Sequence, residues 1–540
     1  MSTLWILYRQ RLRRDRLQLA VWVLSIGVLG LFSVSAIAKT FGDEASRAQV
    51  LQLATATPAI LVLRGLARGP ALDSFTFFEI YAFLALLAGL MNTFMAVRHT
   101  RAEEESGRAE LVAATGAGRW SPLAATVLHG LVADALVSVA VALGFIAGGL
   151  DPAGSFVAGL ATGAAGFAFL GVGLLAGQFF STSRAANGIA AALVMLAYLL
   201  RGYGDATGTV SADGMTVTAA WPSWLSPTGW GQQTFAYTGN RLWPLLLPVG
   251  LAAACIGVVV LIMARRDVGA SVLAGRAGRP DARASLRGTF ALAFRLQQGT
   301  IVGWCLGGLA TGLITGSLGS AIQSTLSSNA SITDALRAMV EAQGTSMTQL
   351  LVAALFEIAG VLAAACGVQA VLRMRQEEAA GTAEFVLSEP VGRARWLGSF
   401  VGLGAISVVL VMGFTALGAW VSLVASGDTS TAVGDVWQTA LAQLPAALIY
   451  LALPAAVFVV WPRATIPAGW ALLGLGVVLG IYGGMLGFDE KIRDISPFTH
   501  TPVVTSTGTD WSGGFWMLAV AAVLALVSLA LMRRREIGTA

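Results

Sequence analysis

Residues 75–97 decide the fold: they read FTFFEIYAFLALLAGLMNTFMAV and carry a single charge, on Glu79. As an α-helix this run is about 35 Å long, enough to cross the ~30 Å hydrocarbon core of a bilayer. The same rule identifies eleven further spans, near residues 19–38, 123–148, 154–181, 187–203, 243–264, 298–320, 348–372, 397–424, 438–461, 466–486 and 514–532. The run at 187–203 is the shortest and least well defined. We therefore predict an all-α polytopic membrane protein with about 12 transmembrane helices.

The composition of the 540-residue chain supports this class. Its residues are 56% hydrophobic and only 12% charged, whereas soluble domains are about 25% charged. High hydrophobicity also excludes intrinsic disorder. The basic residues lie at the ends of apolar runs and do not cluster on a polar face, so no nucleic-acid partner is expected. The three cysteines lie inside apolar runs with no metal-site or disulfide spacing: Cys255, Cys305 and Cys366.

The distribution of basic residues predicts the topology. With the N-terminus in the cytoplasm, the inner segments contain 25 of the 34 Lys and Arg residues. The positive-inside rule then places both termini in the cytoplasm, with an even number of spans. We expect a multi-pass protein of the plasma (inner) membrane.

Five short matches indicate an internal duplication. Motifs of the first half recur in the same order about 270 residues later: Phe78-Glu79-Ile80 as Phe356-Glu357-Ile358, Glu103-Glu104 as Glu377-Glu378, Gly118-Arg119 as Gly392-Arg393, Ser226-Pro227 as Ser496-Pro497, and Arg265-Arg266-Asp267 as Arg534-Arg535-Glu536. Each half starts and ends inside, so two parallel six-helix repeats are predicted. We assign residues 1–267 to the first half and 298–540 to the second. Residues 268–297 form a cytoplasmic linker, whose core is Gly275 to Pro280, followed by a connecting helix.

Several chemistries have no support in the sequence. Lys39 and Lys491 are the only lysines and neither follows a glycine, so there is no Walker A motif. The cytoplasmic segments are too short to fold as a catalytic domain. With three histidines in the chain, no histidine cluster and no metal site are expected. The protein is therefore predicted not to be an enzyme and to hold no cofactor of its own.

The most specific feature is a loop that occurs twice. Residues 98–121 and 373–396 each contain the pattern R-x-E-E-x-x-G-x-x-E. We interpret both copies as short acidic helices whose carboxylates pair with arginines of a cytoplasmic partner. The expected docking residues are Glu103, Glu104, Gly107 and Glu110 in the first copy, and Glu377, Glu378, Gly381 and Glu384 in the second.

This loop, the Ser-Pro before the sixth span and the Arg-Arg-Asp or Arg-Arg-Glu after it resemble the type-2 ATP-binding-cassette (ABC) exporter permeases. The fused two-half form resembles actinobacterial tetronasin or polyketide-antibiotic exporter permeases. The resemblance implies that the loops are coupling helices for a separate ATPase, in two copies, which carries ATP and Mg²⁺. Ala379-Ala380 and Glu389-Pro390 of the second copy depart from the first, which leaves the equivalence of the two loops open.

The substrate path is marked by polar residues within spans, which usually face a cavity or a partner. Glu79 and Glu357 are expected at equivalent places, either as a pair between the halves or as carboxylates that reach water or an arginine. His129 and Asp134 lie about 140° apart on one helix, and each is interpreted as a polar contact between helices. Asn92 and Gln369 are further candidates. The glycine stripes at Gly159-x-x-x-Gly163 and Gly476-x-x-x-Gly480-x-x-x-Gly484 are interpreted as close helix crossings.

The favoured function is an ABC exporter permease that moves hydrophobic or amphipathic, drug-like compounds out of the cell. One alternative is a proton-coupled secondary drug transporter, since twelve spans in two parallel halves also describe that architecture. The acidic loop disfavours it, because a glycine- and arginine-rich loop is expected there. A lipid or glycan exporter permease and a membrane scaffold or sensor also remain open.

Overall fold

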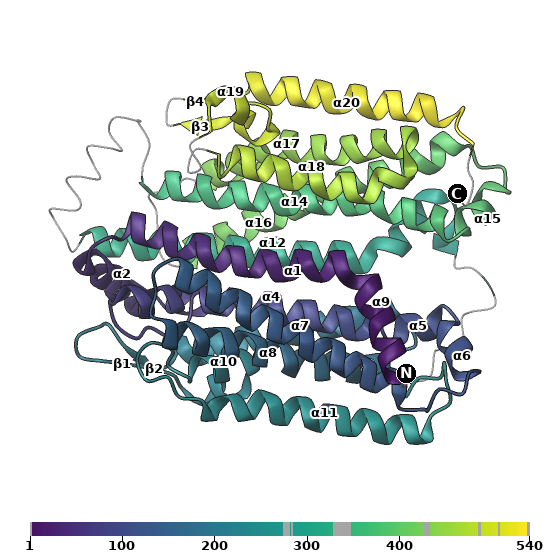
Figure 1. Cartoon of the computed structure of the whole chain (residues 1–540). Coiled ribbons are helices and arrows are strands. Elements are labelled where there is room, and N and C mark those ends of the chain that lie inside the picture. Colours follow the sequence, from purple (N-terminus) through teal and green to yellow (C-terminus); the bar gives the residue numbers. More distant parts are fainter. Residues whose placement is uncertain are drawn as a thin grey trace. The chain divides into compact units, whose positions relative to one another are not determined.

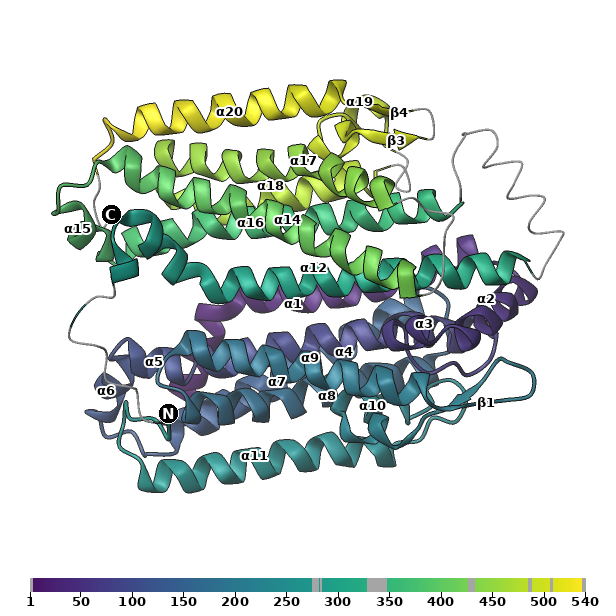
Figure 2. The same cartoon turned by 180° about the vertical axis from the view of Figure 1, so that it is seen from behind.

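A computed structural model of the chain describes residues 3–273, 281, 284–327, 347–425, 433–483, 488–505 and 508–536. Within these ranges, twelve helices are long and apolar enough to cross a membrane, so the prediction of an all-α polytopic protein with twelve spans is confirmed (Figures 1 and 2). The chain divides into two compact units, Met1–Gly278 and Arg279–Ala540, with six of these helices in each. The linker core from Gly275 to Pro280 and the last stripe glycine, Gly484, lie outside the described residues.

Unit 1 is built from six long helices joined by short elements. Its spans are α1 (Thr3–Thr40), α4 (Leu72–Arg98), α7 (Ser121–Ala147), α8 (Pro152–Phe179), α9 (Ser183–Ala206) and α11 (Leu246–Arg265). Its short helices are α2 (Glu44–Ala56), α3 (Pro58–Leu63), α5 (Arg101–Glu105), α6 (Arg108–Ala113), η1 (Trp221–Leu225), α10 (Pro227–Gln232) and η2 (Trp243–Leu245). The strands β1 (Thr209–Val210) and β2 (Val217–Thr218) form an antiparallel hairpin.

Small residues allow the helices of unit 1 to pack closely. α1 packs on α7, α4 packs on α8, and α8 also packs on α7 and α11. A Cβ atom at Gly163 would overlap Oγ of Ser138 and would lie 2.7 Å from the backbone oxygen of Asp134. In lipid, helix association relies on such van der Waals contact, because lipid tails are as apolar as the helices. The interpretation of the Gly159–Gly163 stripe as a helix crossing is confirmed.

The short elements α2 and α3 and the β1–β2 hairpin lie at the end of unit 1 that is opposite α5 and α6 (Figures 1 and 2). A separate apolar cluster holds them, which includes Leu51, Leu61, Phe75 and Val217. Asp43 caps α2 by accepting a hydrogen bond from the Ser46 N–H at 2.7 Å. That backbone hydrogen bond holds the pKa of the Asp43 carboxyl below its usual value.

Unit 2 contains a second set of six spans. They are α12 (Thr289–Ser327), α14 (Met347–Ala379), α16 (Arg393–Ala425), α17 (Val433–Val460), α18 (Thr465–Gly480) and α20 (Ser512–Met532). The shorter elements are η3 (Ala284–Leu286), α15 (Thr382–Leu387), η4 (Pro462–Ala464), α19 (Glu490–Arg493), η5 (Pro497–His500), β3 (Val503–Thr505) and β4 (Gly508–Asp510). β3 and β4 pair as an antiparallel hairpin.

The spans of unit 2 pack in the same pairs as those of unit 1. In each unit the first span packs on the third, the second on the fourth and the fourth on the sixth: α12 on α16, α14 on α17 and α17 on α20 in unit 2. Glycines again permit close approach. A Cβ at Gly476 would overlap the hydroxyl of Tyr450, and a Cβ at Gly480 would lie 2.5 Å from Oγ of Ser496.

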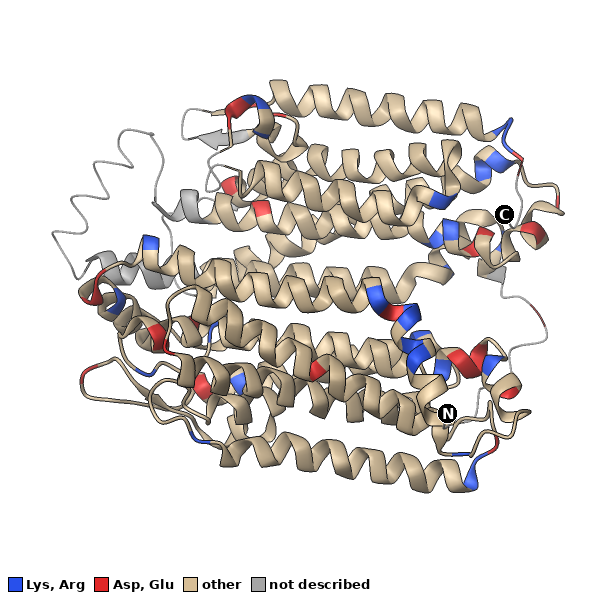
Figure 3. Ribbon diagram, in the orientation of Figure 1, with Lys and Arg blue, Asp and Glu red and all other residues tan. Residues whose placement is uncertain are grey.

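In each unit, charged residues gather at the ends of the long helices and the middle is almost free of them (Figure 3). The basic residues Arg9 to Arg16 lie on the same helix as the first apolar span, because α1 runs unbroken from Thr3 to Thr40. No glycine or proline interrupts residues 4–25. The basic residues of α1 therefore lie at one end of the apolar span.

Candidate functional site: the repeated loop

The loop of unit 1 consists of two short helices joined at a glycine. α5 ends at Glu105, α6 begins at Arg108, and Gly107 between them has a φ of +72°. The loop of unit 2 has the same turn, because Gly381 has a φ of +74° immediately before α15. A positive φ strains any residue with a Cβ. This requirement explains why the loop pattern has glycine at both places.

The second glutamate of the first loop is bound within the chain. Glu104 forms ion pairs with Arg101, at 2.7 Å, and with Arg266. Arg101 is buried, and Arg266 follows the last residue of α11. Arg119 adds a further connection, since it donates to the backbone oxygen of Arg266 at 3.2 Å. The loop is thus bonded to the end of the sixth span.

The second loop repeats this arrangement within unit 2. Glu378 pairs with Arg375, at 3.2 Å, and with Arg535, which lies just after α20. Arg393 donates to the backbone oxygen of Arg535 at 2.6 Å. The Glu378 side chain has no exposed surface. Each loop is therefore held to the end of the sixth span of its own unit by a carboxylate, which is fully buried at Glu378 and 13% exposed at Glu104.

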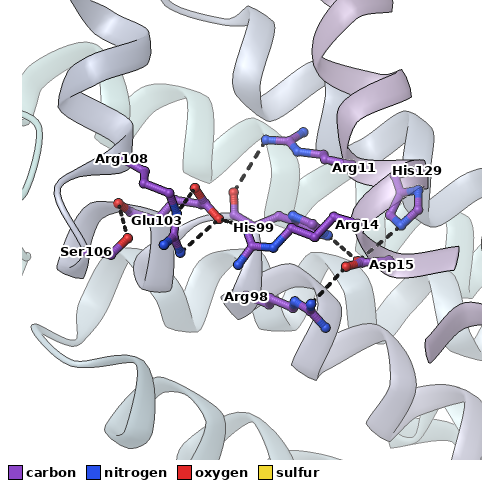
Figure 4. A network of polar contacts seen from close by, with 9 residues as sticks. All are labelled: Arg11, Arg14, Asp15, Arg98, His99, Glu103, Ser106, Arg108 and His129. Carbon is purple, nitrogen blue, oxygen red and sulfur yellow. Dashed lines mark hydrogen bonds and ion pairs between the residues drawn. The ribbon is translucent and has the colours of Figure 1, made fainter. Parts of the chain in front are cut away.

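The first glutamate of each loop is also occupied. Glu103 pairs with Arg14 of α1 and with Arg108, whose Nε lies 2.9 Å away (Figure 4). Glu377 pairs with Arg373 and accepts a hydrogen bond from the Thr382 hydroxyl at 2.6 Å. All four paired glutamates thus bind residues of this chain, whereas the sequence pattern suggested that they point to a partner. Their part in docking stays a prediction.

The exposed part of each loop lies one turn further on. Glu110 and Glu384, the last acidic residues of the pattern, are exposed. They are followed by Leu111, 71% exposed, and Phe385, 78% exposed. Sequence reasoning missed these two apolar residues, although Leu111 and Phe385 are 274 positions apart, the same offset as the glutamates. Each loop therefore presents a carboxylate beside a bare apolar side chain.

The candidate substrate-path residues make contacts between helices. Glu79 is buried and pairs with Arg64 at the end of α3. Asn92 of α4 donates to Asp134 of α7 at 2.7 Å.

In unit 2, Gln369 of α14 accepts a hydrogen bond from Nε1 of Trp304 in α12 at 2.9 Å. Glu357 lies partly buried in α14. The suggested pairing of Glu79 with Glu357 concerns both units and stays a prediction.

Two of the three histidines lie together, which corrects the expectation that no histidine cluster exists. His99, at the end of α4, and His129, in α7, have ring centroids 5.4 Å apart. Both face Asp15 of α1 (Figure 4). The three residues are far apart in sequence and show no local spacing pattern, so the sequence singled out His129 as a polar residue within a span but did not reveal the cluster.

A cavity of about 630 Å³ lies between α1, the loop and the end of α11. Its lining includes Arg11, Arg14, His99, Glu103, Leu111 and Arg266. The cavity beside the loop is therefore lined by both polar and apolar groups, and His99 is part of its lining.

Comparison with known proteins relates the whole chain to a curated relative. This chain is 33% identical over 539 residues to the multidrug efflux system permease protein Rv1217c of Mycobacterium tuberculosis (strain ATCC 25618 / H37Rv). The match covers 98% of this chain and 94% of the relative. A family model described as "Multidrug efflux system permease Rv1217c, C-terminal domain" matches residues 286–533. Those residues lie in unit 2.

Proposed function

Because the chain belongs to the family of multidrug efflux system permeases that includes Rv1217c, we propose that it is the membrane-spanning subunit of an ABC exporter. A separate ATPase, in two copies, binds the two loops and carries the ATP and Mg²⁺. The exporter moves hydrophobic or amphipathic, drug-like compounds out of the cell. The observation that carries the proposal is the pair of loops, each of which is bound to the end of the sixth span and exposes an acidic and an apolar residue.

The exposed residues supply a docking surface of the right chemistry. When a partner covers the side chains of Leu111 and Phe385, they become buried. Full burial of such an apolar side chain contributes roughly 1.5–3 kcal/mol to the free energy of binding. Glu110 and Glu384 beside them are free to pair with arginines of the ATPase. We place both loops, and with them both termini, in the cytoplasm, because 25 of the 34 basic residues then lie on that side.

Ion pairs between each loop and the spans transmit movement of the ATPase. Glu104 binds Arg266 at the end of α11, and Glu103 binds Arg14 in α1. Breaking a buried pair by removing one partner costs about 3–5 kcal/mol, whereas an exposed pair such as Glu103–Arg14 contributes about 1 kcal/mol or less. Displacement of the first loop therefore moves α1 and α11 with it, and in unit 2 the Glu378–Arg535 pair acts on α20 in the same way.

The spans and the relative support this substrate class. Few ionisable groups lie in the middle of the helices (Figure 3), so the path favours apolar compounds over small ions. The relative is named a multidrug efflux system permease, which agrees with drug-like compounds as the substrate class.

The deciding experiment reconstitutes the purified chain in proteoliposomes, with and without a candidate ABC ATPase from the same organism. We expect ATP-dependent movement of a fluorescent lipophilic drug only when both proteins are present. Full drug transport by the chain alone, driven by a proton gradient, would refute the proposal and favour a secondary transporter.

A further inference from the structure

Three donor side chains from three different spans converge at the α5 end of unit 1. Asp15 comes from α1, His99 from the end of α4 and His129 from α7. One ligand atom of each lies within 4.8 Å of the other two. All three residues are buried, and His129 has no exposed surface. The cluster is therefore enclosed and its donors point to one place.

Both imidazoles approach the same carboxylate oxygen. Nε2 of His99 lies 2.5 Å from Oδ2 of Asp15, and Nε2 of His129 lies 3.5 Å from that oxygen. Neither ring nitrogen of His129 makes a hydrogen bond within the described part of the chain. A buried polar atom without a partner costs about 1–3 kcal/mol, so such a group calls for a ligand. The unpartnered imidazole faces the carboxylate, where a cation would satisfy it.

We propose that Asp15, His99 and His129 form a binding site for a divalent transition-metal ion of the Zn²⁺ class. Imidazole nitrogen and carboxylate oxygen suit Zn²⁺, whereas Mg²⁺ and Ca²⁺ prefer oxygen ligands alone. Three protein ligands leave the fourth tetrahedral position to water. In such a site the Asp15 oxygen and each nitrogen lie about 3.3 Å apart, since each ligand is about 2.0–2.1 Å from the ion.

The surroundings of the cluster fit this role. Nη2 of Arg98 lies 3.2 Å from the other carboxylate oxygen, Oδ1 of Asp15. That contact leaves Oδ2 to the ion and orients the carboxylate, as outer-shell partners do at metal sites. The imidazoles must be neutral to bind, so metal binding displaces the proton shared by His99 and Asp15.

An ion can reach the cluster from the cavity. His99 forms part of its wall, together with Glu103 and Glu104. The site therefore has an entry path, which a buried metal site requires.

Metal binding would join three spans directly before the first loop. The backbone oxygen of His99 also accepts a hydrogen bond from Arg11 of α1 at 3.5 Å. An ion at the cluster would hold α1, α4 and α7 together where α5 begins, and so restrain the loop. Inhibition of drug export by the ion is the expected consequence. This consequence rests on the proposed function, whereas metal binding itself does not.

The test measures metal binding by the full chain in detergent, without any ATPase. After treatment with a chelator, the wild-type chain is titrated with Zn²⁺ and its metal content is measured after desalting. We expect about one ion per chain, and a Co²⁺ absorption spectrum of the tetrahedral type. His99→Gln and His129→Gln should each weaken binding by more than about tenfold.

The third histidine provides the matched control. His500 lies in η5 of unit 2, where its Nε2 is 2.8 Å from the backbone oxygen of Asp494. His500→Gln should leave Zn²⁺ binding unchanged. The proposal is overturned if the wild type binds no ion, or if His99→Gln and His129→Gln bind as the wild type does. The wild-type titration decides the first point even if a variant fails to fold.

Discussion

Glu104 binds Arg266 across 162 residues of chain, which joins the first loop to the end of α11. Removing this carboxylate leaves the buried Arg101 and the partly buried Arg266 without their anion. We predict that Glu104→Gln destabilises the protein by about 3 kcal/mol and that it abolishes drug-stimulated ATP hydrolysis by the assembled complex. Thermal unfolding in detergent and ATPase assays measure the two effects.

The control for this variant is Glu389→Gln, a neutralisation of an exposed glutamate near α15. It should change stability by less than about 0.5 kcal/mol. Equal unfolding temperatures for Glu104→Gln and the wild type would show that the ion pair contributes nothing.

The exposed apolar residues of the loops should govern assembly and not folding. Leu111→Asp and Phe385→Asp place a charge on a surface that is already solvated, so the free energy of unfolding should change by less than about 0.5 kcal/mol. Co-purification of the ATPase should fall at least tenfold, because an apolar anchor becomes a buried charge in the complex. Val210→Asp, on the exposed β1 strand, is the control and should assemble normally. Normal assembly of both loop variants would place the docking surface elsewhere.

Substitution of a loop glycine that has a positive φ should destabilise the loop through backbone strain and not through a steric clash. A Cβ at Gly107 meets no atom within 4 Å, so Gly107→Ala should destabilise the loop only through its φ of +72°, by about 1–2 kcal/mol. Gly116→Ala is the matched control, since Gly116 is equally open and has no positive φ. Hydrogen exchange of the loop amides should rise in the first variant only. Identical exchange in both would contradict the role of the turn.

A large side chain at the place where α7 crosses α8 should clash with the neighbouring helix. Gly163→Leu forces the helices apart, because even a Cβ would overlap Ser138. We expect loss of the folded protein, or destabilisation of more than about 3 kcal/mol. Gly250→Leu in α11 meets no atom within 4 Å of its Cβ, and should fold normally. Similar yields of monodisperse protein for both variants would argue against close packing at this crossing.

The buried Asn92–Asp134 contact separates the two transport mechanisms. Polar contacts between membrane helices are worth about 0.6 kcal/mol on average, so Asp134→Asn should fold and should keep ATP-driven export. A proton-coupled transporter would instead need an ionisable group within its spans. Loss of drug transport in a variant that folds and still assembles with its ATPase would count against the ABC mechanism.

The candidate site could be predicted only in part. The motif positions Glu103, Glu104 and their counterparts 274 residues later are visible in the sequence, as is the need for glycine in the turn. Their partners are not visible, because Arg266 and Arg535 approach the loops only when the sixth span packs on the fourth. The glutamates therefore looked available to a partner protein, whereas Glu104 and Glu378 are bound inside their own units.

By itself, the sequence determined the number and positions of the spans, because the free energy of insertion depends on a local run of about 20 apolar residues. Tertiary structure alone decided which charges meet. Asp15, His99 and His129 occupy one site because α1, α4 and α7 pack against one another there, and Glu104 meets Arg266 because α11 returns to the loop. Such contacts join residues separated by 30 to 162 positions, and a local hydrophobic pattern contains no information about which distant side chains become neighbours.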